Sequence, residues 1–135
     1  MPLLVIHPNN LPKVWPIAAP LLQKAIDIDP EQITIEQVEF SVRTGRVFLL
    51  VWEEPDVGIT GAVTVEFMDY PRERVAHVNL MGGKGVVREH VFEEAKAWMR
   101  SCGATTAQCW CKENLVPMYK KMGMDSSYHV MRTKL

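Results

Sequence analysis

The chain has 135 residues, the length of one ordinary domain and enough to bury a core without disulfide or metal cross-links. Its hydrophobic fraction of 47% and charged fraction of 23% are typical of folded globular proteins, and they exclude the disordered and collagen-like classes. Fifteen basic and sixteen acidic residues give a formal charge of -1, so no overall field favours binding to nucleic acid or to an anionic membrane. We expect one folded domain over residues 1–135.

The N-terminal segment and the cysteines indicate a cytoplasmic protein. Residues 1–7 are apolar only briefly and lack the basic start and the small-residue cleavage site of a signal peptide. No apolar run approaches the roughly 20 residues that cross a bilayer. The three cysteines, Cys102, Cys109 and Cys111, are odd in number, which favours reduced thiols over a disulfide framework.

The first third of the chain predicts a strand followed by two helices. An apolar run over residues 3–7 is typical of a strand and ends at a Pro-Asn-Asn turn. Apolar residues at three- and four-residue spacing predict a helix over residues 11–26, whose prolines Pro16 and Pro20 place its well-formed part near Pro20. The same spacing predicts a second helix over residues 35–44, closed by the glycine that follows it.

Strands dominate the middle of the chain and alternate with helices after it. Three strands joined by short polar turns, over Val47–Trp52, Ile59–Phe67 and Val75–Leu80, predict an antiparallel meander. The later elements are a helix over Val86–Arg100, a strand over Ala104–Cys111, a short helix over Asn114–Met122 and a last strand over Tyr128–Thr133. A helix between two strands requires a crossover, so the sheet should be mixed.

The predicted class is therefore α/β (α+β): a mixed, mostly antiparallel central sheet flanked by about four helices, in the order β-α-α-β-β-β-α-β-α-β. This order resembles the GNAT superfamily of acyl-CoA-dependent N-acyltransferases across nearly the whole chain. The segment Cys111–Met124 is similar to the penultimate helix of that family, in which an Asn opens the helix, a Tyr lies near its end and a Gly follows. Asn114, Tyr119 and Gly123 fall on those positions, with Met124 in place of the usual aromatic residue.

A glycine-rich segment after the third strand of the meander resembles the pyrophosphate-binding loop of the same family. Glycines let backbone N–H groups approach a phosphate, and the N-terminus of the following helix adds a partial positive charge. The resemblance implies that the residues binding acetyl-CoA, or another acyl-CoA, are Gly82, Gly83, Lys84, Gly85, Val86, Arg88 and Asn114. Two departures from the family are a shorter loop and Leu80 at a position usually occupied by Gln or Arg.

The resemblance implies an N-acyltransferase that moves an acetyl or short acyl group from acyl-CoA to a primary amine by direct attack in a ternary complex. Tyr119 is the candidate general acid toward the CoA sulfur; in the alternative interpretation it only packs at the end of its helix. Glu66 and His77 are the candidate general bases, and His77 has an unperturbed pKa near 6.5. Either residue is otherwise the solvent-facing half of a strand alternation. Lys120 and Lys121 are expected on a solvated helix surface, and in the alternative interpretation they reach the 3'-phosphate of CoA.

No metal is expected, because Cys109 and Cys111 have no second pair at zinc-type spacing and free cysteines are usually small buried apolar residues. The acceptor is expected to be a small-molecule or protein amine, and the protein a monomer or a homodimer. The competing hypothesis is a GNAT-shaped protein without catalysis, a binding or structural component of the kind that phages encode. Leu80 and the short glycine loop favour this alternative.

Overall fold

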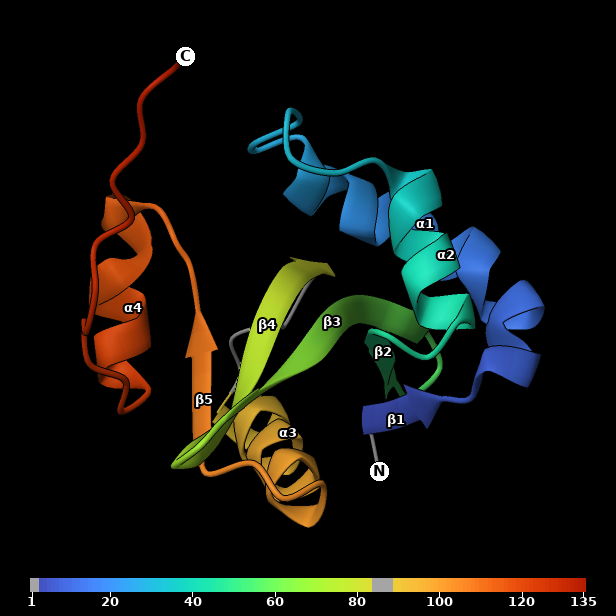
Figure 1. Cartoon of the computed structure of the whole chain (residues 1–135). Helices are drawn as coiled ribbons and strands as arrows, with labels where there is room; N and C mark the ends of the chain where they lie inside the picture. The colour runs from blue at the N-terminus through green and yellow to red at the C-terminus, as the bar shows by residue number, and fades with distance from the viewer. Residues whose placement is uncertain (1–2, 84–88) are drawn as a thin grey trace.

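A computed structural model describes residues 3–83 and 89–135, and these residues form a five-stranded sheet with helices on both faces (Figure 1). The strands follow one another across the sheet in chain order, and they are β1 (Leu3–Ile6), β2 (Phe48–Glu54), β3 (Gly58–Tyr70), β4 (Glu73–Gly83) and β5 (Thr106–Cys109). The first four strands pair antiparallel, whereas β5 runs parallel to β4. The predicted mixed, mostly antiparallel sheet is confirmed.

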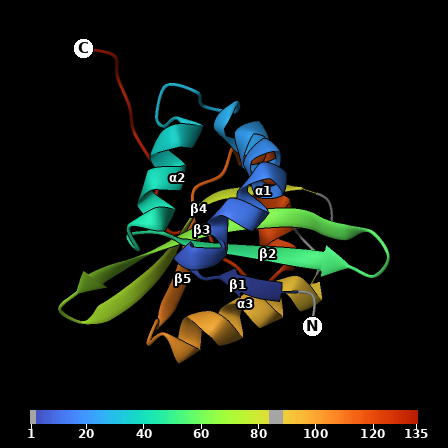
Figure 2. The same ribbon diagram turned by 90° about the vertical axis from the view of Figure 1, so that its right-hand side faces the viewer.

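The described residues also contain four α-helices and two 3-10 helices, in agreement with the expected number of helices. They are η1 (Pro8–Asn10), α1 (Leu11–Ile26), α2 (Ile35–Arg43), α3 (Glu89–Ser101), η2 (Glu113–Leu115) and α4 (Val116–Lys121). Helices α1 and α2 cover one face of the sheet and α3 covers the other (Figure 2). Helix α4 stands beside β5 (Figure 1).

Alternating residues of the central strands supply a core on each face of the sheet. Leu49 of β2 and Ala62 of β3 are buried with Leu22 of α1 on one side. Leu50 of β2 is buried with Met99 of α3 on the other side. This alternation follows from the two-residue period of a strand. Successive side chains of one strand therefore pack into the two cores on opposite faces of the sheet.

Helix α1 is continuous from Leu11, so the expectation that its well-formed part begins near Pro20 is wrong. The prolines Pro12, Pro16 and Pro20 are four residues apart and all exposed, which places them on one stripe of the helix that faces solvent. Pro12 lies in the first turn, where no such bond is made, whereas Pro16 and Pro20 lack the N–H that would bond to the carbonyls of Pro12 and Pro16, which lie on the same exposed stripe. Water can satisfy them there, so the helix continues.

Helix α2 begins and ends at the residues that its sequence signals indicate. The Thr34 hydroxyl accepts from the Gln37 N–H at 3.3 Å, while the Gln37 side chain accepts from the Thr34 N–H at 3.0 Å. This reciprocal capping box satisfies two donors that the first turn of a helix leaves free. At the other end Gly45 has a φ of +79°, the left-handed conformation that closes a helix.

The predicted last strand over Tyr128–Thr133 does not form, and that prediction is wrong. These residues have no strand pairing, and the side chains of Tyr128 and Met131 are 90% and 87% exposed. Strand β5 is only four residues long, against the predicted Ala104–Cys111, and it offers a short edge. The tail is held instead by ion pairs from Arg132 and Lys134 to the loop that follows α1.

Candidate active site

One residue of β4, Asn79, has no partner on β3. Val78 pairs with Val65 and Leu80 pairs with Thr64, so Asn79 is the extra residue of a β-bulge. The Leu80 N–H donates to Thr64 Oγ1 at 3.1 Å, which fixes the bulge. The parallel pairing of β4 with β5 ends at Val78, although β4 itself continues. In the described residues, the two strands therefore part at the bulge.

A cavity of about 520 Å³ lies beside the bulge, on the face of the sheet that α2 covers. Its walls are α2 with the loop before it, and strands β3 and β4. Glu36, Arg46 and Glu66 bring charge to this cavity, and the bulge residues Asn79 and Leu80 line its sheet side. Its size and its few convergent polar groups suit a small polar ligand.

Glu66 projects from β3 into this cavity and is held by two neighbours. Its Oε1 atom accepts from Asn79 Nδ2 at 3.4 Å, and its Oε2 atom lies 3.7 Å from Arg46 Nε. The side chain of Glu66 is 26% exposed, whereas that of Arg46 is 77% exposed. The carboxylate is thus positioned and still open to a ligand, so it can bind an ammonium group or take a proton.

His77 lies opposite Glu66 across the β3–β4 pair, but it is only 6% exposed and does not line the cavity. Its Nδ1 atom lies 3.0 Å from Gln108 Nε2 of β5, and the Trp110 ring packs edge-on against the imidazole. Burial lowers the pKa of His77, and the Glu66 carboxylate offsets part of this effect. With the Gln108 amide donating to Nδ1, the neutral ring carries its proton on Nε2.

Tyr119 of α4 lies on the opposite face of the sheet, where it lines the same cavity as Cys109 at the end of β5. Burial raises the pKa of Tyr119 far above its ordinary value, and Cys109 adds to this rise. Burial also raises the pKa of the Cys109 thiol, Cys111 raises it further, and the hydrogen bond from Tyr119 opposes them. Near neutral pH the Tyr119 phenol therefore carries its proton.

A second, apolar cavity of about 50 Å³ lies on this face and includes Tyr119 in its wall. Val78 and Met81 of β4 line it, facing away from Asn79 and Leu80, which line the larger cavity. The part of β4 that β5 leaves unpaired thus runs between the two cavities. The structure brings Glu66 and His77 together on one face of the sheet and places Tyr119 on the other.

Three solved structures with low sequence identity share this architecture. A probable acetyltransferase is 15% identical, with a TM-score of 0.71 over 100% of this chain and 97% of its own. Glucosamine-6-phosphate N-acetyltransferase from Arabidopsis thaliana is 16% identical, with a TM-score of 0.66 over 98% of this chain and 96% of its own. A predicted acetyltransferase from Clostridium acetobutylicum, solved with acetyl-CoA, is 10% identical, with a TM-score of 0.65 over 98% and 94% of the two chains. The chain has the GNAT fold.

The resemblance to GNAT proteins is therefore confirmed at the level of the fold. In sequence, no family model matches the chain and no curated protein is significantly similar to it. Within residues 3–83 and 89–135, no helix is both long and apolar enough to span a membrane, and no group of three or more His, Cys, Asp or Glu residues is arranged to bind a metal.

The glycine loop of this GNAT fold is described only at its start. Gly82 is buried, and a Cβ atom there would lie 2.0 Å from the carbonyl oxygen of Leu21 in α1. Gly83 has a φ of +111°, and its Cβ atom would lie 2.2 Å from the carbonyl oxygen of Thr60. Both glycines are thus required by packing or backbone conformation alone. The other residues predicted for the loop, Lys84, Gly85, Val86 and Arg88, lie outside the described residues.

The remaining candidates lie apart from the two cavities, and the predicted site included little of the wall of the larger one. Asn114 in η2 and the lysines Lys120 and Lys121 of α4 are exposed and line neither cavity. Arg46 was missed because it follows the glycine that closes α2 and carries no motif. Asn79 also lies outside the predicted site, and only the pairing register reveals it as the bulge.

Proposed function

We propose that this protein transfers an acetyl or other short acyl group from acyl-CoA to a primary amine held in the 520 Å³ cavity. The bulge at Asn79 carries this proposal, since it marks the point where β4 leaves β5. On one side of that point lies a cavity with a positioned carboxylate, and on the other lies the Tyr119 phenol, which burial keeps protonated. Aminolysis of a thioester needs a proton acceptor for the amine and a proton donor for the sulfur.

In this proposal Glu66 and Tyr119 have complementary roles. Glu66 binds the amine and takes the proton that it loses when its nitrogen bonds to the acyl carbon. Tyr119 gives a proton to the sulfur as the carbon–sulfur bond breaks. His77 is the other candidate base, but its Nδ1 lone pair is already engaged by the amide of Gln108. That contact favours Glu66 as the general base. In this proposal His77 stabilises the part of the sheet on which Glu66 lies.

The residues around the unpaired part of β4 have the chemistry that acyl-CoA requires. An open strand edge offers N–H and C=O groups to an extended chain that contains amides, and the apolar cavity beside it suits methylene groups. Acyl-CoA supplies the acyl group as an activated thioester. The residues proposed to bind it are the loop from Gly82 to Val86, then Arg88 and Asn114. The apolar cavity is small, so binding requires side chains of α4 and the turn after it, such as Met122 and Met124, to move aside.

The test combines isothermal titration with acetyl-CoA and an assay of thiol release with a panel of primary amines. We expect saturable binding in the micromolar range and thiol release that depends on the amine. Glu66→Gln and Tyr119→Phe should each lower kcat/KM by about 10²-fold or more while acetyl-CoA still binds. Tyr70→Phe removes an exposed tyrosine that lines neither cavity, and it serves as the matched control. No binding at millimolar acetyl-CoA would exclude the acyltransferase.

A second candidate function is a GNAT-shaped binding protein without catalysis. Two observations favour it. Close backbone contacts alone explain why residues 82 and 83 are glycines, and Leu80 packs against the apolar core beneath α1. In that case the protein would bind neither acetyl-CoA nor small amines, and its exposed apolar tail around Tyr128 and Met131 would be the surface for a protein partner. The titration with acetyl-CoA separates the two functions.

A further inference from the structure

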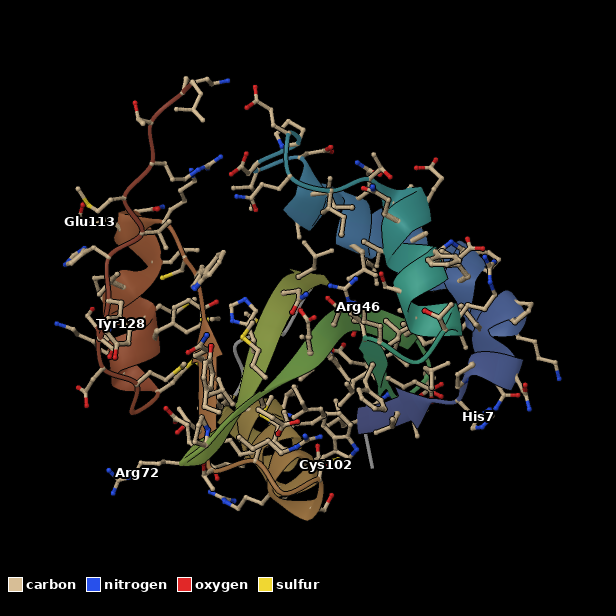
Figure 3. All side chains as sticks on the ribbon, in the orientation of Figure 1. His7, Arg46, Arg72, Cys102, Glu113 and Tyr128 are labelled. Atoms are coloured by element: carbon tan, nitrogen blue, oxygen red, sulfur yellow. The ribbon has the colours of Figure 1, made fainter. Side chains whose placement is uncertain are left out.

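Arg46 is the cation that lines the 520 Å³ cavity in the described residues, and its guanidinium group makes no hydrogen bond there. Its contact with protein charge is the ion pair from Nε to Glu66 Oε2, at 3.7 Å. That distance is longer than a hydrogen bond, so the planar fork of donors at the end of the side chain is available to a ligand. Figure 3 shows Arg46 between α2 and strands β3 and β4, where the cavity lies.

We propose that the acceptor amine carries an anionic group, a carboxylate or a phosphate, a few bonds from its nitrogen. Glu66 binds the ammonium group and Arg46 binds the anionic group. This inference rests on the proposed function, because it identifies the class of amine that the acyltransferase accepts. The two side chains present opposite charges next to each other, which is the pattern that a short zwitterionic molecule complements.

The ion pair between Arg46 and Glu66 does not prevent this binding. The Arg46 side chain is 77% exposed, and exposed ion pairs contribute between zero and about 1 kcal/mol to stability. A bidentate contact from Arg to a carboxylate or phosphate is stronger and more directional than such a pair. A ligand that offers one charge to each partner therefore replaces a weak ion pair with two stronger ones.

The backbone holds Arg46 in place for this role. Its N–H donates to the Ser41 carbonyl at 3.0 Å, and Gly45 before it takes the left-handed conformation. These contacts tie Arg46 to the C-terminal end of α2, so only the side chain must be ordered when a ligand binds.

The other carboxylate of the cavity, Glu36, does not oppose an anionic ligand at Arg46. It lies in the first turn of α2, and Arg43 in the last turn comes seven residues later, a rise of roughly 10 Å. The residues of α2 that line the cavity between these two positions, such as Gln37, Phe40 and Ser41, are uncharged. An anionic group next to Arg46 is therefore well separated from Glu36.

The experiment measures the affinity of matched amines by NMR titration of the full chain at pH 7, independently of turnover. The probes are β-alanine against β-alaninamide, and O-phosphoethanolamine against ethanolamine, so each pair differs mainly in the anionic group. We expect the anionic member of at least one pair to bind about tenfold more tightly, equivalent to about 1.4 kcal/mol. The pair with the larger ratio distinguishes a carboxylate from a phosphate. Ionic strength near 1 M should reduce the ratio.

Two arginine variants decide whether Arg46 is responsible. Arg46→Gln should reduce the ratio to about one, whereas Arg43→Gln should leave it unchanged, because Arg43 ends α2 only three residues before Arg46 but pairs with Glu39 outside the cavity. Equal or weaker binding of the anionic probes, no binding of any probe, or an unchanged ratio in Arg46→Gln would overturn the proposal. Thiol release from acetyl-CoA with the same amines tests the acyltransferase separately, since selective binding without turnover contradicts only the proposed function.

Discussion

Gln108 Nε2 of β5 lies 3.0 Å from Nδ1 of His77 of β4, and this contact joins the two parallel strands just before they part. Trp110, two residues further along the chain, packs against the same imidazole with ring centroids 4.9 Å apart. His77 is thereby removed from water at the base of the candidate active site. Its protonation should therefore affect the stability of the fold as well as any chemistry.

The first prediction concerns stability in mild acid. Because burial lowers the pKa of His77, the folded protein binds this proton less readily than the unfolded chain, whose His has a pKa near 6.5. The unfolded state then binds more protons as pH falls below about 6.5, so the free energy of unfolding decreases there and is fully retained above that pH. His77→Gln should remove this part of the decrease, as measured by urea unfolding at pH 7.5 and pH 5.5.

The control for this prediction is His129→Gln, which changes an exposed histidine in the tail. This variant should keep the pH dependence of the wild-type protein. If His77→Gln loses as much stability as the wild-type protein between the two pH values, the imidazole is not buried in its neutral form.

The second prediction is that the phenol of Tyr119 stays protonated in alkaline solution. Burial and the neighbouring Cys109 raise its pKa well above the ordinary value of about 10. Tyr119→Phe should therefore leave the rise in phenolate absorbance up to pH 10.5 unchanged, with circular dichroism confirming that both proteins remain folded. A rise smaller by one phenol, calibrated with a tyrosine model compound, would show that Tyr119 ionises normally. For the acyltransferase, the result means that Tyr119 remains a proton donor throughout the working range.

The third prediction separates packing from phosphate binding at the start of the glycine loop. Gly82→Ala places a methyl group against the Leu21 carbonyl of α1, and we expect it to lower the free energy of unfolding by about 3 kcal/mol. Gly123→Ala meets no atom within 4 Å and should cost only about 1–2 kcal/mol through its positive φ. Chemical denaturation measures both. If the two variants lose the same free energy of unfolding, α1 moves easily to accommodate the methyl group. Packing against α1 would then not explain the glycine at position 82.

The sequence predicted most of the fold because each element carried its own signal. The apolar period and the closing glycine marked α2, and the capping box that the structure shows at Thr34 agrees with them. The prolines of α1 led to a wrong prediction of where the helix begins. Their cost in helix stability depends on whether the carbonyls that they leave without a hydrogen bond face water. That depends on packing, which a local pattern does not contain.

The candidate site was harder to predict because it depends on register. Glu66 and His77 were named as polar strand residues, but their position opposite each other follows from the pairing of β3 with β4. The bulge at Asn79 shifts that register by one residue, and no turn or glycine in the strand marks it. Tyr119 was found only through its family motif, and its contact with Cys109 joins two elements that share no pattern in the sequence.

The last prediction concerns the C-terminal tail, which is held across the molecule by charge. Arg132 lies 2.9 Å from Asp29 and Lys134 lies 3.0 Å from Glu31, in the loop that continues into the wall of the larger cavity. All four side chains are at least partly exposed, and such pairs contribute between zero and about 1 kcal/mol each, so the attachment is weak. Reversing both tail charges, as Arg132→Glu with Lys134→Glu, should release the tail while the free energy of unfolding changes little.

Limited proteolysis with chymotrypsin measures the release, because the exposed Tyr128 lies in the tail. Cleavage after Tyr128 should become several-fold faster in the reversed variant, and in the wild-type protein at 1 M salt, where screening acts over about 3 Å. Adding Asp29→Lys and Glu31→Lys to the reversed variant restores opposite charges and should return the slow rate. If cleavage is equally fast in all of these proteins, the ion pairs do not hold the tail against the loop beside the cavity.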